Sequence, residues 1–262
     1  MSSTVRVTYY DTAMTLIEMG GLRLLTDPVL DPDGTIVDDG PVRLVKTASP
    51  PINEEALGRI DAVLLSHDQH ADNLDVGGRA LLRRVRLTLT TPAAAERLGG
   101  TARGLTPWAS HELTGADGAT VTVTAVPARH GPDEVAEIVG PVTGFVLATD
   151  QPAAHPIYIS GDTIRFAGLD DIGARFAPFG LALLHIGRAQ VEPLGAVPLS
   201  LSAAEAADLA SDLQARIVVP LHFEGWRHLT EGRRDAEPAF VTQGIGRQVR
   251  WLNRGESLSV EL

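Results

Sequence analysis

Cysteine is absent from the 262-residue chain, which excludes disulfides and thiolate metal ligands. Any metal site must therefore be built from nitrogen and oxygen donors. Long apolar runs are absent as well, and none approaches the ~20 residues that a membrane-spanning helix needs. The opening residues MSSTVRVTYY lack the basic stretch followed by an apolar stretch that marks a secretory signal. From these absences we expect a cytoplasmic protein.

Positive charge is also scarce. The chain has 22 Lys and Arg residues against 33 Asp and Glu residues, which gives a formal net charge of −11, and Lys46 is its only lysine. A surface of this sign repels phosphate backbones and anionic lipid headgroups. We therefore expect neither nucleic acid nor a membrane as a partner, and a small-molecule substrate instead. Association into a homo-oligomer stays open.

The pattern of apolar residues predicts a mixed α and β protein. With 44% hydrophobic residues, the chain can bury the core of one large domain over residues 1–262. A β-meander opens the chain, and the glycine pair Gly20-Gly21 supplies a tight hairpin turn within it. The expected elements are strands over 5–10, 14–19, 22–27, 61–65 and 217–219, a long loop over 28–50, and helices over 54–59, 93–98 and 203–214.

The run SHDQHADNLD, from Ser66 to Asp75, follows the apolar, strand-like stretch from Ala62 to Leu65. It places two histidines and several carboxylates at a strand end. Imidazole nitrogen and carboxylate oxygen are ligands that suit zinc, manganese or iron. The alternative is a solvated turn whose aspartates face water, since short motifs also arise by chance.

Three further strand-like runs close on a ligand-type residue. TVTVTAVPARH ends at His130, PIYISGDT carries Asp162 near its end, and ARIVVPLH ends at His222. Four separate strands that each deliver histidine or aspartate to their ends are hard to obtain by chance. The sequence therefore predicts a metal-dependent enzyme.

The order of these motifs resembles the metallo-β-lactamase superfamily over nearly the whole chain. The nearer resemblance is to its ascorbate-6-phosphate lactonase-like and N-acylphosphatidylethanolamine phospholipase-like branch. That branch opens with a strand pair ending in Asp-Pro-Val, here Asp27-Pro28-Val29. The resemblance implies an α/β fold, the four-layer αββα sandwich, as a single metallo-hydrolase domain over residues 1–262.

The resemblance also implies a metal centre. The implied ligands are His67, His70 and His130 for one ion, and Asp72, Asp162 and His222 for the other. Asp162 would bridge if both ions bind, and Asp72 would hold the attacking water and accept its proton. Asp72 and Asp162 are therefore the expected catalytic residues. The cofactor would be one or two divalent ions, with zinc expected first and manganese or iron as alternatives.

The chain departs from the usual superfamily string H-x-H-x-D-H. Gln69 reads as an insertion, Asp68 falls where the first histidine should be, and Asn73 stands at the last histidine. We expect His67 to be a ligand and Asp68 not, because the extra residue can bulge the turn. An amide is a poorer ligand than an imidazole, so we expect one tightly held ion and a second that is weak or absent.

Residues beyond these motifs are expected to line the substrate. The candidates are His185, Phe223, Trp226 and His228, with a hydrogen-bonded core position as the alternative for His185. The aromatic residues have core packing as their alternative. Asp27 is expected equally as a turn residue before Pro28 and as a residue that orients a ligand histidine.

Two functions remain open on the sequence alone. The first is a metal-dependent hydrolase that cleaves a lactone, amide or phosphodiester bond of a small molecule with metal-activated water. The alternative is a metal-binding protein of the same fold without hydrolytic turnover, or with non-hydrolytic biosynthetic chemistry. Asn73 favours the alternative, whereas the intact set of His130, Asp162 and His222 favours the hydrolase.

Overall fold

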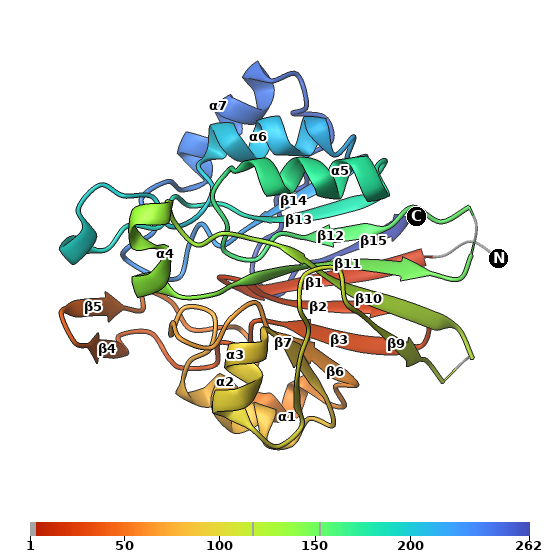
Figure 1. The fold of residues 1–262 in the computed structure, drawn as a ribbon, viewed down its shortest axis with the longest axis horizontal. Coiled ribbons are helices and arrows are strands. Elements are labelled where there is room, and N and C mark those ends of the chain that lie inside the picture. Colours follow the sequence, from red (N-terminus) through yellow and green to blue (C-terminus); the bar gives the residue numbers. More distant parts are fainter. Residues whose placement is uncertain (1–3, 117, 152) are drawn as a thin grey trace.

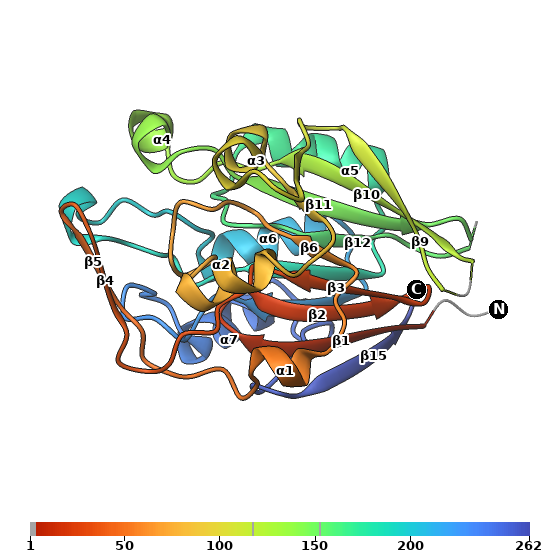
Figure 2. The same ribbon diagram turned by 90° about the horizontal axis from the view of Figure 1, so that it is seen from below.

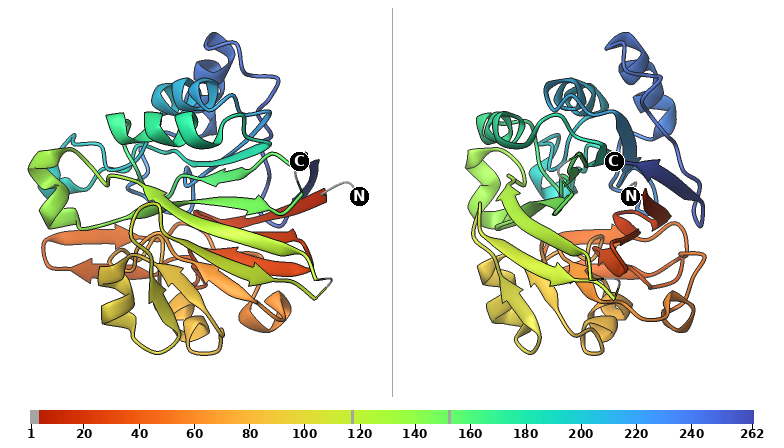
Figure 3. Two further views of the ribbon diagram at one scale, coloured as in Figure 1. Left: turned by 45° about the vertical axis from the view of Figure 1, so that its right-hand side comes forward. Right: turned by 90° about the vertical axis from the view of Figure 1, so that its right-hand side faces the viewer.

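The computed structural model describes residues 4–116, 118–151 and 153–262. Two large β-sheets lie face to face, and helices cover the outer face of each (Figure 1, Figure 3). The layers therefore follow the order αββα, which confirms the sandwich expected from the sequence. A small two-stranded hairpin stands apart from both sheets.

The first sheet has seven strands in the order β15-β1-β2-β3-β6-β7-β8. The expected meander is its antiparallel part, and the turn between β2 and β3 is made by Gly20 and Gly21. Their φ angles of 53° and 69° suit the type I′ turn of a tight hairpin. The strands are β1 (Thr4–Asp11), β2 (Met14–Met19), β3 (Leu22–Thr26), β6 (Ala62–Leu64), β7 (Thr88–Thr90), β8 (Ala102–Gly104) and β15 (Ser257–Glu261).

The second sheet has six strands in the order β14-β13-β12-β11-β10-β9. The strands are β9 (Ser110–Thr114), β10 (Thr120–Pro127), β11 (Thr143–Thr149), β12 (Ile157–Ile159), β13 (Leu181–His185) and β14 (Ile217–Leu221). Strands β12, β13 and β14 are parallel, as are β3, β6, β7 and β8 in the first sheet. Parallel strands end at the same edge of their sheet, so the segments that follow them collect there.

The helices form the outer layers (Figure 2). The first sheet is covered by α1 (Glu54–Leu57), α2 (Val76–Leu82) and α3 (Pro92–Leu98), and the second by α5 (Asp170–Phe176), α6 (Ala203–Asp212) and α7 (Arg233–Thr242). The remaining helical segments are α4 (Asp133–Val139) and the 3₁₀ turns η1 (Ala167–Leu169) and η2 (Glu192–Leu194). Among the described residues, none of the helices has both the length and the apolar character needed to cross a membrane.

Successive side chains of a strand point to opposite faces of its sheet. The apolar residues therefore form three core layers, one between the two sheets and one between each sheet and its helices. In β13, Leu181 and Leu183 join the core between the sheets, whereas Ala182 and Leu184 pack with the helices outside. Strand β6 behaves in the same way on the other side of the sandwich. Because both faces of these strands are covered, they read as continuous apolar runs rather than as alternating ones.

The structure corrects the expected long loop over residues 28–50. This segment contains an antiparallel hairpin of β4 (Ile36–Asp39) and β5 (Val42–Val45). Its Pro, Gly and Asp content obscured two short, polar strands. The expected helix starts are confirmed, because Asn53 caps α1 and Ser202 forms a capping box with Glu205 at α6. Both helices end two residues earlier than expected.

Lys46 is buried at the exit of this hairpin. Its Nζ lies 2.8 Å from Oδ2 of Asp11, both side chains are 0% exposed, and the ring centroid of Trp226 lies 5.0 Å from Nζ. Arg254 approaches the other carboxylate oxygen of Asp11 at 2.9 Å. Lys46 therefore ties the hairpin to the end of β1 and to the loop that follows β14.

We expect Lys46→Met to lower the free energy of unfolding by about 3 kcal/mol, because it leaves Asp11 buried with a weaker set of partners. Urea denaturation measures this loss. Arg43→Met in the same hairpin is the control, because the Arg43–Asp38 pair is 61% and 63% exposed and its removal should change stability by less than about 1 kcal/mol. Equal effects of the two substitutions would contradict a structural role for the Lys46 pair.

Candidate metal centre

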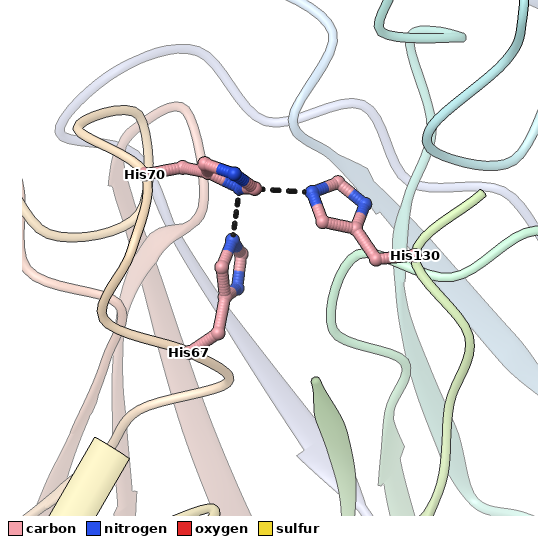
Figure 4. Close-up of side chains that lie close together, drawn as sticks. All are labelled: His67, His70 and His130. Atoms are coloured by element: carbon pink, nitrogen blue, oxygen red, sulfur yellow. Dashed lines mark hydrogen bonds between the residues drawn. The ribbon is translucent and has the colours of Figure 1, made fainter. Parts of the chain in front are cut away.

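Three histidines from two sheets converge on one point (Figure 4). His67 and His70 follow β6 of the first sheet, and His130 follows β10 of the second. Nδ1 of His70 lies 2.9 Å from Nε2 of His67 and 3.0 Å from Nε2 of His130. All three ligand atoms lie within 4.8 Å of one another. We call His67, His70 and His130 the histidine cluster.

Two members of the histidine cluster are held in the tautomer that a metal requires. His130 donates from Nδ1 to the carbonyl oxygen of Leu199 at 2.5 Å, so its Nε2 presents a lone pair to the centre. The Oγ of Ser66 donates to Oδ1 of Asp27 at 2.9 Å and can therefore accept from Nδ1 of His67, also at 2.9 Å. Asp27 is thus both the turn residue and the residue that orients a histidine.

His67 and His130 are also in the neutral state that binding a cation requires. Burial, together with the neighbouring His70 and His130, holds the pKa of His67 well below its usual value. Burial likewise lowers the pKa of His130 to about 4. These two rings are therefore neutral at pH 7 and carry the lone pairs that bind zinc-like ions.

A second cluster consists of Asp72, Asp162 and His222, and all three are buried. Nε2 of His222 lies 3.1 Å from Oδ2 of Asp72 and 3.3 Å from Oδ2 of Asp162. Nδ1 of His222 faces the carbonyl oxygen of Ile186 at 3.4 Å. Oδ2 of Asp162 is buried without a hydrogen-bond donor. A buried carboxylate oxygen of this kind needs a positive charge beside it, and a divalent ion would supply one. We call these residues the carboxylate cluster.

The metal-free carboxylate cluster holds a proton on its histidine. Burial by itself lowers the pKa of His222, but the carboxylates of Asp162 and Asp72 outweigh it and raise this pKa to about 9. Burial raises the pKa of Asp162, yet His222 and His185 outweigh it and hold this pKa well below its usual value. Metal binding here must displace that proton, so the two are in competition.

His185 and Asn73 orient Asp162 from behind. His185 is fully buried, and its Nδ1 lies 2.9 Å from Oδ1 of Asp162. Asn73 donates from Nδ2 to the same oxygen at 3.3 Å and to Oγ of Ser66 at 3.4 Å. The structure therefore places His185 in its alternative position, a hydrogen-bonded core site, and not on a substrate wall.

Asp68 and Gln69 point away from both clusters. Asp68 forms ion pairs with Arg97 and Arg79, and its side chain is 3% exposed. Gln69 donates from Nε2 to the carbonyl oxygen of Pro141 at 2.9 Å. The extra residue lets the turn present His67 and His70 together while Asp68 lies outside the histidine cluster.

The two aromatic residues expected on the substrate wall are packed in the protein interior. Phe223 packs against Tyr9 and Trp251 with ring centroids 6.4 Å and 5.3 Å away, which is a core position. Trp226 is 3% exposed beneath Lys46, so it is also packed rather than open. Neither aromatic ring has a free face for a substrate.

His228 lies closer to the chemistry than the sequence indicated. Its Nε2 is 2.9 Å from Oδ2 of Asp72, and its side chain is 9% exposed. The sequence reasoning missed this contact, and the only signal for it is a second histidine six residues after His222.

Comparison with known proteins supports a superfamily assignment. The family profile described as the β-lactamase superfamily domain matches residues 22–223. An uncharacterised protein of Mycobacterium tuberculosis is 32% identical over 199 residues, which cover 71% of this chain and 50% of that protein. The chain thus spans about half the length of this mycobacterial relative. A UPF0173 metal-dependent hydrolase of Pyrococcus furiosus is 26% identical and covers 98% of this chain and 100% of its own length.

A solved structure shares the fold. The isothiocyanate hydrolase from Delia radicum gut bacteria superposes with a TM-score of 0.80 at 23% identity, and the match covers 97% of this chain and 98% of that one. At this identity the likeness concerns the fold alone, and the four-layer arrangement is common to both chains.

We expect His67→Ala to weaken metal binding by more than about 100-fold, because loss of a ligand exceeds the 10–100-fold typical of residues that only orient one. Asp68→Asn should keep the affinity within about tenfold, since Asp68 pairs with Arg97 outside the histidine cluster. Competition with a chromophoric chelator measures both. If Asp68→Asn lost the metal and His67→Ala retained it, Asp68 and not His67 would be the ligand.

The chelated protein should lose stability as the pH rises from about 6.5 to 9. The folded-state pKa of His222 is raised to about 9, so its contribution is fully present below the unfolded pKa near 6.5 and disappears above 9. Burial raises the pKa of Asp27 to about 8, which acts in the same direction. Urea melts at pH 6.5, 7.5 and 8.5 test this trend, and His222→Gln should reduce its slope. Stability that rises over this range would contradict the prediction.

Proposed function

Since the chain belongs to the β-lactamase superfamily, we propose that it is a metal-dependent hydrolase of a small molecule. The bond cleaved would be a lactone, amide or phosphodiester. The single observation that carries this proposal is the pair of ligand clusters at the strand ends, one made of three histidines and one of two aspartates and a histidine, with Asn73 donating both to Asp162 and to Ser66 beside His67. The metal-dependent hydrolase name of the Pyrococcus relative supports it.

The donors in both clusters fit a divalent ion. In the histidine cluster, His67 and His130 offer neutral imidazole nitrogens, and the carboxylate cluster offers two anions around Asp162 Oδ2, which has no hydrogen-bond donor. Zinc suits this mixture of nitrogen and oxygen ligands, and manganese or iron would also be accepted. A bound ion would lower the pKa of water to roughly 7 and polarise the bond under attack.

The two aspartates would have different roles, one in holding the ion and one in activating the water. Asp162 is 1% exposed and is held by His185 and Asn73, so it is fixed as an anchor. Asp72 is the more accessible carboxylate, with a side chain 6% exposed. Asp72 would therefore be the residue that orients the attacking water and accepts its proton.

Access to the site is expected from the side of His70 and His228. His67, His130 and His222 are buried, whereas His70 and His228 are partly exposed, His228 with 9% of its side chain. A small substrate would approach over these two rings. The acidic surface of the chain is consistent with a small-molecule substrate rather than a polyanion.

The test is turnover of three generic substrates: an aryl phosphodiester, an aryl lactone and an anilide. Protein loaded with zinc, manganese or ferrous iron should hydrolyse one class, lose the activity with a chelator and regain it with the metal. Asp72→Asn should keep the fold and lower kcat by at least about 100-fold, because general-base catalysis contributes that much. Thermal melts and metal content are recorded for each variant.

Asp133→Asn is the matched control, since Asp133 is 78% exposed in a surface pair with Arg129. It should leave kcat unchanged. An unchanged kcat in Asp72→Asn at equal metal content would remove Asp72 from the mechanism. A metal-loaded protein inactive on all three classes would favour a metal-binding role without hydrolysis.

A further inference from the structure

Gln69, which reads as an insertion in the sequence, lies in the turn between two histidines of the cluster. The superfamily string H-x-H has one residue between these histidines, whereas Asp68 and Gln69 both separate His67 from His70 here. A longer turn has more backbone freedom, and ordering it costs more conformational entropy. The two rings nevertheless lie with Nε2 of His67 2.9 Å from Nδ1 of His70. Contacts of the inserted residues must therefore hold the turn in place.

The amide of Gln69 is oriented by two donors to the same oxygen. Its Oε1 accepts from the backbone N–H of Asp68 at 3.1 Å and from Nη2 of Arg97 in α3 at 3.0 Å. An amide whose oxygen accepts these bonds presents its NH2 group to acceptors on the other side. Arg97 also forms an ion pair with Asp68, so the orientation of Gln69 is fixed from α3.

The NH2 group of Gln69 contacts the end of α4. Its Nε2 donates to the carbonyl oxygen of Pro141 at 2.9 Å and lies 3.4 Å from the carbonyl oxygen of Val139, the last residue of the helix. Gly140 stands between these two residues with a φ of 90°, and a Cβ at this position would lie 2.7 Å from Nε2. The glycine therefore leaves the space that the amide occupies.

Helix α4 connects this contact to the third histidine, since α4 begins three residues after His130. At the far end of α4, the side chain of Gln69 is joined by a backbone contact, in which the N–H of Thr143 donates to the carbonyl oxygen of Ser66 at 3.0 Å. Two histidines of the cluster follow a strand of the first sheet and the third follows a strand of the second. Their separation therefore depends on ties between the two halves of the sandwich, and Gln69 supplies a side-chain tie.

We propose that Gln69 is a positioning residue for the histidine cluster. Its side chain fixes the turn of His67 and His70 to the end of α4, whose start follows His130, so the three rings are held together before an ion binds. A site that is ordered in advance binds its ligand more tightly, because the ordering entropy is not lost on binding. The proposal rests on the proposed function only in that a divalent ion binds this cluster.

The experiment measures metal binding to the histidine cluster in Gln69→Ala and Gln69→Glu. The first variant removes the amide, and the second keeps the side-chain size and an acceptor but lacks the donor to Pro141. Zinc affinities are obtained by competition with a chromophoric chelator, and cobalt spectra are recorded at saturation. The spectrum that disappears in His67→Ala belongs to the histidine cluster. Gln190→Ala is the matched control, because Gln190 donates from Nε2 to the carbonyl oxygen of Ala196 at 3.1 Å within the segment between β13 and α6.

Both Gln69 variants should bind zinc in the histidine cluster about 10–100-fold more weakly than wild type, the loss typical of a residue that orients a ligand. Their cobalt spectrum for this cluster should also change, because the three rings are less constrained. Urea unfolding of the metal-free variants should stay cooperative, which separates lost positioning from a lost fold. Gln190→Ala should keep the affinity and the spectrum of wild type.

A loss of affinity below about tenfold in Gln69→Ala, with an unchanged cobalt spectrum, would overturn the positioning role. An equal loss in Gln190→Ala would overturn it as well. A wild type that binds no ion would overturn the proposed function together with the positioning role. A wild type that binds ions but hydrolyses none of the three substrate classes would overturn the hydrolase alone, because the affinities and spectra decide the role of Gln69 without turnover.

Discussion

Two carboxylates buried side by side are the constraint on which this structure depends. Asp72 and Asp162 both face Nε2 of His222, and neither has a lysine or arginine beside it within the described residues. Ionised carboxylates in a dry interior are costly unless they are paired. The metal-free fold solves this with a protonated His222, whose pKa is raised to about 9. A divalent ion would compensate the two negative charges more fully than a protonated histidine does. The unfavourable free energy of burying the two carboxylates therefore favours metal binding.

Backbone carbonyls supply much of the precision around the two clusters. Leu199 fixes the tautomer of His130, and Ile186 faces the ring of His222 in the same way. These carbonyls belong to the segments that follow β13 and precede α6, and their places are set by the sheet. For His130, whose pKa is lowered to about 4 by burial, this leaves Nε2 free to bind a metal at neutral pH, whereas Nε2 of His222 carries a proton that a metal must displace. The scaffold thereby sets the chemical state of its ligands as well as their positions.

Two segments at one end of the sandwich are linked to loops that carry residues of the candidate metal centre. Figure 1 and Figure 2 both show α4 and the β4–β5 hairpin projecting at the same end of the molecule. Helix α4 begins three residues after His130, and the hairpin exit holds the loop of His228 through Lys46. Helix α4 is therefore joined to the loop of His130, and the hairpin to the loop of His228. A substitution in the hairpin can change the centre without touching a ligand.

The sequence alone determined the order of motifs, the meander and the helix caps, because these depend on local spacing and strand periodicity. The two ligand sets were implied by the resemblance of those motifs to the metallo-β-lactamase superfamily. The sequence could not place His228 beside Asp72, or the ion pairs of Asp68 with Arg97, since those contacts join residues far apart in the chain. It also predicted an open wall where Phe223 packs into the core, because periodicity does not reveal which face a neighbouring helix covers. Only the tertiary structure decided these points, through the packing of two sheets whose ends meet at one site.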